Sequence, residues 1–321
     1  MKRYLITGGT GFIGRNITEA LLKRHVLIRI LDNEFRNPSQ VPKNTNVEFI
    51  KGDIRDTKTV LNACRGVESI IHLAFINGTK NFYEKPDLVL SVGVKGILNV
   101  LDGAKMHNVT ELFLASSSEV YQTPQIIPTP EDVPFSIPSL KNPRYSYAGG
   151  KIISELLSYH VGRTFLKKVV IFRPHNVYGP NMGKEHVIPE LITKILTQKQ
   201  KRIKLQIQGS GRETRSFIYI DDFTNALLLI LKKGKSGEVY NVGTDEEISI
   251  ARIVKMLEKI ADKKINLVKS PSPPGSVIRR CPDIRKIIAL GFTPTKSLEE
   301  GLKQTYLWYN THKNAGDNRK K

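Results

Sequence analysis

Apolar residues along the chain gather in short runs, and stretches with helical periodicity lie between them. Several runs are apolar without alternation, which is typical of a parallel sheet buried on both faces. The runs predict strands at residues 4–6, 26–31, 47–50, 69–73, 111–115 and 168–172. The periodic stretches predict helices at residues 13–23, 57–63, 95–105 and 147–163. This alternation predicts an α/β fold with a doubly wound parallel sheet.

The rhythm changes after about residue 173. Turns rich in proline and glycine follow at residues 178–180 and 208–211, and a helix is expected near residues 250–260. The segment SPSPPG at 270–275 breaks any regular element, while residues 238–242 have the composition of a strand that returns to the main sheet. We therefore expect a smaller, mixed α/β lobe beside the doubly wound domain.

Length and composition indicate a globular protein. The 321 residues can bury a sizeable core, and 40% apolar and 25% charged residues are ordinary values. The chain runs from MKRYLI directly into a glycine-rich turn, and its apolar runs fall short of the ~20 residues of a spanning helix, so we expect neither signal peptide nor membrane segment. Cys64 and Cys281 form neither a disulfide framework nor a metal-binding spacing. We expect a cytoplasmic protein with reduced thiols and no metal.

The chain is strongly basic, with 50 lysines and arginines against 30 acidic residues and a formal net charge of +20. Such a charge suits nucleic acid, an acidic surface or a phosphorylated ligand. The lysines are scattered, and their short clusters do not alternate with aromatic residues as in a single-strand binding platform. We therefore expect no nucleic-acid partner; a steeply salt-dependent affinity for DNA or RNA would reveal one.

The first strand is followed by GGTGFIG, in which Gly8, Gly11 and Gly14 are spaced three apart. Glycines allow a tight turn and a close approach of the backbone to a pyrophosphate, which binds the unpaired amides of the following helix. Asp32 ends the second strand, at about the spacing of an acid that hydrogen-bonds the ribose of NAD. NAD is the expected cofactor. Arg36 keeps NADP open, and without the glycine turn Asp32 would be interpreted as a polar loop residue.

Tyr147 and Lys151, in YAGGK, are four residues apart and so share one face of a predicted helix. An ammonium group beside a phenol favours the phenolate and lowers the pKa of the phenol from about 10 toward neutrality. Such a tyrosine can take or return an alcohol proton. Taken alone, a tyrosine and a lysine at this spacing are also common on solvated helix faces.

With both motifs present, residues 2–309 resemble the extended short-chain dehydrogenase/reductase family, particularly its nucleotide-sugar epimerases, dehydratases and decarboxylases. The resemblance rests on an ordered series: GGTGFIG, Asp32, GDIRD at 52–56, HLA at 72–74, SSSEVY at 116–121, YAGGK, RPHNVYGP at 173–180 and RETRSFIYIDD at 212–222. It implies a Rossmann-type NAD-binding domain over residues 1–175, with a returning segment near 217–245. The substrate lobe would span residues 176–216 and 246–312, followed by a frayed basic tail at 313–321.

The resemblance also implies roles for single residues. Ser117 would hydrogen-bond the reacting hydroxyl, Tyr147 would be the base, and Lys151 would hold the nicotinamide ribose and tune the tyrosine. The cofactor would contact Gly8, Gly11, Phe12, Ile13, Gly14, Asp32, Asp53, Ile54, Leu73 and Ala74. The nucleotide-diphosphate sugar would contact Ser118, Asn176, Arg215 and Arg280, with the fork of Arg215 suited to phosphate oxygens. His175 and His186 are further candidates for a sugar hydroxyl, and the plainer interpretation of both arginines is as surface cations.

Three positions depart from the family pattern. Gly93 stands where asparagine is frequent in the helix beside the cofactor, and Gly150 replaces a frequent serine before the lysine. Gln122 replaces the usual glycine after Val-Tyr. None of the three removes a reacting group, but they bear on local packing and substrate range.

Glu119 bears on the reaction itself. Oxidation of the C4 hydroxyl of a sugar to a ketone acidifies the C5 proton, which a nearby carboxylate can abstract. In the family, 4,6-dehydratases and sugar-acid decarboxylases often carry an acid two residues after the serine, and many simple 4-epimerases lack it. Many dTDP-glucose dehydratases also have aspartate at the position of Ser118, whereas serine there is more like GDP-mannose dehydratases and UDP-glucuronate decarboxylases. The resemblance therefore favours a 4,6-dehydratase or decarboxylase with a 4-keto intermediate and Glu119 as the C5-side base.

Two alternatives stay open. If Glu119 only caps a turn or pairs with a basic neighbour, the chain is better explained as a simple 4-epimerase. A non-catalytic dinucleotide-binding sensor would need only the glycine turn and Asp32, and the presence of Ser117, Tyr147 and Lys151 argues against it. By analogy, the helices at 95–105 and 147–163 imply a homodimer, and the family implies a role in polysaccharide or glycan-precursor biosynthesis.

Overall fold

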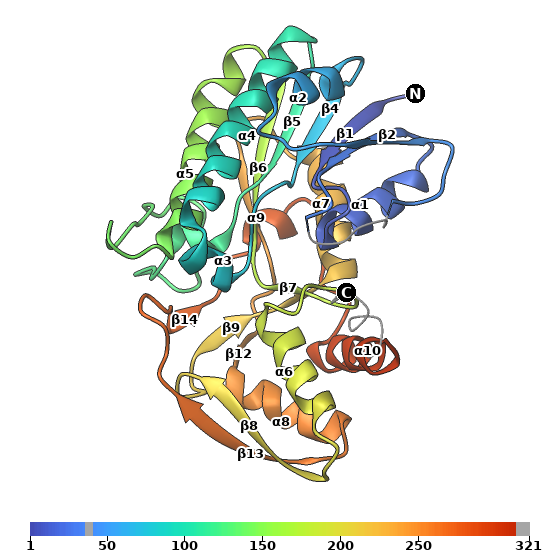
Figure 1. Ribbon diagram of the computed structural model, residues 1–321. Helices are drawn as coiled ribbons and strands as arrows, with labels where there is room; N and C mark the ends of the chain where they lie inside the picture. Colours follow the sequence, from blue (N-terminus) through green and yellow to red (C-terminus); the bar gives the residue numbers. More distant parts are fainter. Residues whose placement is uncertain (36–40, 313–321) are drawn as a thin grey trace.

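The computed structural model describes residues 1–35 and 41–312, so Arg36 and the tail predicted at 313–321 lie outside the described residues. A larger lobe holds a central sheet between two layers of helices (Figure 1). A smaller lobe lies below it in the same view and carries its own short strands and three helices, labelled α6, α8 and α10.

The central sheet consists of seven parallel strands in the order β11-β6-β5-β4-β1-β2-β3. They are β1 (Arg3–Thr7), β2 (Leu27–Asp32), β3 (Val47–Lys51), β4 (Ser69–His72), β5 (Glu111–Ala115), β6 (Lys168–Pro174) and β11 (Val239–Val242). Every strand expected in this sheet is present, including the late one, which pairs with β6. The predicted doubly wound α/β fold is confirmed. The strand order reverses between β1 and β4, which leaves a crevice at their carboxyl ends.

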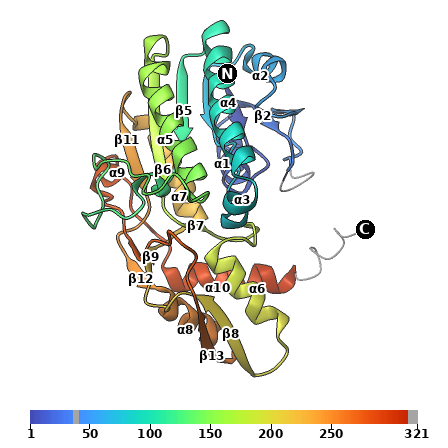
Figure 2. The same ribbon diagram turned by 60° about the vertical axis from the view of Figure 1, so that its left-hand side comes forward.

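Helices cover both faces of the sheet, which explains why its strands are apolar without alternation. One core cluster joins the sheet to α1 (Phe12–Leu22) and α7 (Ile220–Lys233). A second cluster joins the other face to α2 (Thr57–Cys64), α4 (Pro86–Met106) and α5 (Tyr145–His160). Figure 2 shows α4 and α5 side by side along that face.

Helix α4 is longer than its sequence pattern predicts. It begins at Pro86, a residue suited to the first helical position, whereas the pattern predicts a start at residue 95. The sequence DLVLSVGV in between resembles a strand because valine and leucine crowd it. Packing against α2 and α5 overrides that preference. A short helix just before it, α3 (Thr79–Glu84), is not predicted from the sequence.

The smaller lobe is mixed, as predicted. Strand β8 (Arg202–Gln208) pairs in parallel with β13 (Lys264–Ser270), and only alternate residues of β8 are buried because one face alone is covered. The other strands are β7 (Val177–Tyr178), β9 (Thr214–Ser216), β10 (Ile218–Tyr219), β12 (Glu247–Ser249) and β14 (Arg279–Arg280). The helices are α6 (Val187–Thr197), α8 (Ile250–Ile260) and α10 (Leu298–Thr311), of which α8 has the predicted bounds. A four-residue helix, α9 (Arg285–Ile288), lies beside β11.

Candidate active site

The glycine turn between β1 and α1 is built so that its backbone is exposed to a ligand. Gly8 has φ +73, and a Cβ there would lie 2.8 Å from Ala74 N. A Cβ on Gly14 would lie 2.2 Å from Gly8 O, so the first turn of α1 packs directly on the loop. Gly11 is the N-cap and supplies no side-chain cap. The helix therefore offers its N-terminal amides to an anion such as a pyrophosphate.

Asp32 lies at the end of β2 and braces this turn. Its Oδ2 accepts a hydrogen bond from Thr10 N at 3.0 Å, and its Oδ1 accepts one from Glu34 N at 2.7 Å. Asp53 lies across the same end of the crevice, where hydrogen bonds from Arg55 lower the pKa of its carboxyl. Both carboxylates line the cleft at the end that holds the glycine turn.

Ser117 follows β5 and opens a single 3-10 turn, η1 (Ser118–Tyr121). Its Oγ accepts a hydrogen bond from Glu119 N at 3.2 Å, so the serine caps the turn that carries the glutamate. Gln122 ends the turn with φ +49, a left-handed conformation that favours glycine. Its side chain donates to Glu119 O at 2.6 Å and so supports the turn.

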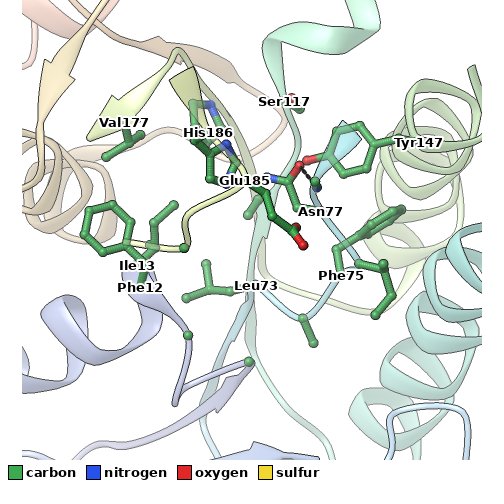
Figure 3. A pocket seen from close by; sticks show the side chains of 18 of the residues that line it. Phe12, Ile13, Leu73, Phe75, Asn77, Ser117, Tyr147, Val177, Glu185 and His186 are labelled. Carbon is green, nitrogen blue, oxygen red and sulfur yellow. Dashed lines mark hydrogen bonds between the residues drawn. The ribbon is translucent and has the colours of Figure 1, made fainter. Parts of the chain in front are cut away.

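Tyr147 and Lys151 lie on α5, and both line the cleft. Figure 3 shows Tyr147 near Ser117. The Tyr147 ring stacks on Phe82 with centroids 4.7 Å apart, and its hydroxyl is directed into the cleft. Lys151 is buried, and its Nζ donates a hydrogen bond to Ala115 O at 2.6 Å. Burial lowers the pKa of the Lys151 ammonium to about 7, although the Glu155 carboxylate opposes the shift.

Glu119 is paired with arginines. Arg280 Nη1 donates to Glu119 Oε1 at 2.8 Å, and Arg144 Nη2 lies 3.6 Å from the same oxygen. Burial raises the pKa of the Glu119 carboxyl, but the two guanidinium groups outweigh it and lower the pKa to about 2. The carboxylate is therefore an anion at neutral pH. The sequence alternative in which Glu119 pairs with a basic neighbour describes a contact that is present.

Arginines dominate the substrate end of the cleft. Within the described residues, Nε and Nη2 of Arg280 are buried and have no hydrogen-bond partner, and so is Nε of Arg144. Arg215 is held by backbone oxygens, with Nη2 donating to Val277 O at 2.6 Å. Burial and the nearby charge of Arg280 lower the pKa of the Arg215 guanidinium to about 10. This end of the cleft is therefore suited to an anionic ligand.

The two histidine candidates differ. His186 lines the cleft at the start of α6, whereas His175 is fully buried and is not among the lining residues. His175 Nε2 lies 3.1 Å from Asn241 Oδ1, and burial lowers its pKa to about 3. The suggestion that His175 contacts a sugar is therefore wrong, because its ring lies in the buried layer beneath the site. Asn176 does line the cleft, with its Nδ2 donating to Ser216 O at 2.8 Å.

One cleft of about 400 Å³ joins the glycine turn to the arginines. The residues to which the family resemblance assigns a catalytic, cofactor or substrate role all line it: Gly8, Gly11, Phe12, Ile13, Gly14, Asp32, Asp53, Ile54, Leu73, Ala74, Ser117, Ser118, Glu119, Tyr147, Lys151, Asn176, Arg215 and Arg280. Sequence reasoning did not identify several other lining residues: Phe75, Asn77, Phe82, Arg144 and Glu185. Phe75 directly follows the HLA motif, Asn77 lies two residues further on, and Arg144 lies three residues before Tyr147, so proximity to motifs was the available signal.

Two negative findings concern the described residues only. No group of three or more His, Cys, Asp or Glu side chains there is placed to hold a metal ion. Among the same residues, no helix has both the length and the apolar content to cross a membrane.

Comparison with known proteins gives consistent results. A model of the NAD dependent epimerase/dehydratase family matches residues 4–243. The chain is 30% identical to human dTDP-D-glucose 4,6-dehydratase, over 96% of this chain and 90% of that protein. It is 31% identical to UDP-glucuronic acid decarboxylase 1 of Xenopus tropicalis, over 96% and 72%. The structure of UDP-glucose 4-epimerase from Thermotoga maritima with UDP-glucose superposes with a TM-score of 0.88 and 26% identity, over 97% and 100%.

Proposed function

The chain belongs to the NAD dependent epimerase/dehydratase family, and we propose that it decarboxylates a nucleotide-diphosphate sugar acid through a 4-keto intermediate. One observation carries this choice. The Glu119 anion, paired with Arg280, lies two residues after Ser117 in the same cleft as Tyr147 and Lys151. The site can thus work on a sugar carbon next to the one that Ser117 and Tyr147 address.

NAD fits the glycine turn of this chain. The close approach of α1 to Gly8 leaves no room for a side chain on Gly14, and the uncapped helix end is free to meet a pyrophosphate. When bound there, NAD would supply a reversible hydride acceptor for C4 of the sugar. Asp32 supports NAD over NADP, because its carboxylate would repel the phosphate of NADP.

Tyr147 and Lys151 transfer the proton of the C4 hydroxyl. Tyr147 takes the proton of the C4 hydroxyl as the ketone forms, and returns it when the ketone is reduced. The Lys151 ammonium favours the phenolate because the two side chains share one face of α5. Ser117 orients the same hydroxyl by a hydrogen bond.

The charge state of Glu119 favours decarboxylation over dehydration. Loss of water requires both a base that takes the C5 proton and an acid that protonates the departing C6 hydroxyl, and Glu119, an anion at neutral pH with its pKa near 2, can serve only as the base. Ser118 also stands where many dTDP-glucose dehydratases have aspartate. Loss of CO₂ from a 4-keto acid needs no such donor: the C5–C6 electron pair enters the enolate, and a solvent proton then adds at C5. The unpaired donors of Arg280 are available to a substrate carboxylate or diphosphate.

A simple 4-epimerase is the second candidate. It is favoured by the same ion pairs, because a glutamate paired with Arg280 and Arg144 can have a purely structural role, with the Arg280 pair joining the two lobes. In that case the 4-keto sugar rotates in the cleft, and hydride returns to the opposite face of C4.

Product masses separate these reactions. The protein would be incubated with NAD and matched sets of UDP-, GDP-, dTDP- and CDP-linked sugars and sugar acids. We expect one sugar acid to lose CO₂ while the neutral sugars keep their mass. Loss of water from a neutral sugar would indicate a dehydratase, and inversion at C4 without mass change would indicate an epimerase. Tyr147→Phe is the control and should form no product; if parent and variant alike form none, the sensor alternative gains.

We also propose a homodimer that forms through α4 and α5. Their outward faces expose large apolar side chains, among them Leu98, Ile153 and Leu156, at 38 to 45% of their surface. Exposed apolar patches of this kind are typical of interfaces. Sedimentation should give twice the chain mass, and Leu156→Glu should give the monomer.

We further propose a reducing, cytoplasmic location, which the free thiols of Cys64 and Cys281 support. The proposed pathway is the synthesis of glycan precursors.

A further inference from the structure

Phe75 is an aromatic residue in the cleft that the proposed chemistry does not use. It follows the HLA motif after β4, and its half-buried side chain lines the cleft beside Tyr147 (Figure 3). Nothing in the sequence pattern assigns it a role. Its contacts, however, involve both groups that handle the C4 proton.

The same ring touches Tyr147 and Lys151. Lys151 Nζ lies 4.1 Å from the centroid of the Phe75 ring, within the range of a cation–π interaction. The Tyr147 ring meets Phe75 edge-on, with centroids 5.1 Å apart and planes at 78°. Phe75 therefore restricts the ammonium and the phenol at once.

Two glycines make room for this ring. A Cβ added to Gly93 on α4 would lie 2.5 Å from Phe75 Cζ, and one added to Gly150 on α5 would lie 2.9 Å from the same atom. Both glycines lie inside helices, where glycine is less favourable than any residue except proline. Gly149, next in the chain, would meet nothing within 4 Å. The two departures from the family pattern at Gly93 and Gly150 are thus explained by one neighbour, and we call this pair the Phe75 seat.

The ring also determines what surrounds the ammonium. Lys151 donates to Ala115 O on one side and faces the Phe75 ring on another. The titratable groups that act on it are Tyr147 and Glu155 on its own helix and His72 on β4. An asparagine or serine in the seat would bring a hydrogen-bonding atom to this place, where the chain instead has an apolar ring. A cation–π contact is strongest where water is excluded.

We propose that Phe75 is a positioning residue: seated on Gly93 and Gly150, its ring holds the Lys151 ammonium beside Tyr147 and keeps water away from it. The inference rests on the proposed function, in which Tyr147 and Lys151 move the C4 proton. In this role Phe75 acts through those two side chains.

The seat is tested by stability, without reference to turnover. Gly150→Ala should lower the melting temperature of the parent, because its Cβ meets the ring. The same change should be harmless or stabilising when combined with Phe75→Ala, and Gly149→Ala, the control, should not lower the melting temperature. Equal effects of Gly150→Ala in both backgrounds would show that the ring does not occupy the seat, and would overturn the proposal.

The positioning role is tested by kinetics once a substrate is known. Phe75→Leu keeps an apolar side chain but has no π face, and Phe75→Ala admits water. We expect Phe75→Ala to lower kcat about tenfold or more, with KM for the nucleotide sugar changed less than about twofold. Because water screens Lys151 from Tyr147, the acid limb of the kcat profile should move up by about one pH unit. The kcat and the pH profile of Phe75→Leu should fall between those of the parent and those of Phe75→Ala.

Two outcomes separate the claims. If both Phe75 variants keep the parent's kcat and pH profile, the positioning role is wrong even where decarboxylation is found. If no nucleotide sugar is converted by the parent, the proposed function fails, and the stability cycle alone then decides whether the ring and its two glycines form one unit.

Discussion

Glu119 lies between two guanidinium groups and stays ionised throughout the neutral range. That arrangement brings together residues far apart in the chain, since Arg280 is 161 positions from Glu119. The glutamate could be found from its place two residues after Ser117, because the motif is local. Its partners could not, because nothing in the spacing of Arg144 or Arg280 indicates which carboxylate each will meet.

Removing the Glu119 charge should separate the two halves of the reaction. Glu119→Gln leaves Arg280 and Arg144 unneutralised but keeps the shape of the side chain. Because the freed guanidinium groups should then hold the substrate carboxylate and oppose loss of CO₂, we expect overall turnover to fall about 10² to 10³-fold. C4 oxidation should persist as a transient rise in NADH absorbance. Glu119→Asp keeps the charge, retracts it, and should lose less. Full turnover of Glu119→Gln at saturating substrate would contradict a role in the reaction.

The buried Lys151 ammonium should lower the stability of the folded protein, although the proposed reaction requires it. Its pKa is lowered to about 7 in the fold and is 10.5 in the free side chain, so the ionised form is penalised by burial. The penalty is complete below pH 7 and shrinks as the pH rises toward 10.5, where the folded protein has already lost the proton that the unfolded chain retains.

Lys151→Met should therefore raise the melting temperature by several degrees at pH 6 to 7 and abolish turnover. Thermal unfolding across pH checks both sign and range: the advantage of the variant should decline above pH 7. An advantage that grows with pH, or a variant less stable at every pH, would refute the burial argument.

The glycine turn and α4 illustrate what the sequence reveals about elements. The turn was predictable because its glycines serve a local backbone requirement, and GGTGFIG states that requirement directly. The start of α4 at Pro86 was not, because the strand-like DLVLSVGV is helical only through its packing on α2 and α5. Phe75 escaped detection for the same reason: its meaning depends on two helices that lie beside it only in the folded chain.

Within the turn, two glycines should respond differently to alanine. A Cβ on Gly14 would lie 2.2 Å from Gly8 O, whereas one on Gly11 would lie 3.2 Å from that oxygen. Gly14→Ala should therefore displace α1, lower the melting temperature and reduce bound NAD more than tenfold. Gly11→Ala, the matched variant, should lower the melting temperature less, because its Cβ meets only the Gly8 oxygen, at 3.2 Å. Thermal unfolding of each purified variant without NAD would decide, and equal losses of melting temperature would contradict the close-packing argument.

The two lobes of the molecule meet at the substrate end of the cleft. Arg280 on β14 reaches Glu119 beyond β5, and Pro274 O accepts hydrogen bonds from Tyr83 at 2.8 Å and Asn142 at 3.1 Å. The fold class and the larger lobe could be predicted because short apolar runs alternate along the chain with stretches of helical periodicity. The contacts between lobes did not, because they join loops with no periodic pattern.

The net positive charge of the whole chain should make KM for the nucleotide sugar depend on salt concentration. A net charge of +20 attracts an anionic nucleotide sugar over distances that salt screens, since the Debye length falls from about 30 Å at 0.01 M to about 8 Å at 0.15 M. KM should rise several-fold over that range while kcat changes little. Steady-state kinetics in sodium chloride provide the check, and a KM independent of salt would show that the charge does not steer the substrate.

The most direct test of the account is the deuterium content at C5 of the product formed in deuterated water, read by proton NMR. Chemistry at C5 through a 4-keto intermediate requires a solvent proton there, so we predict deuterium at C5 in essentially every product molecule. A product with inverted C4 and only protium at C5 would contradict the account and leave Glu119 as a structural partner of Arg280.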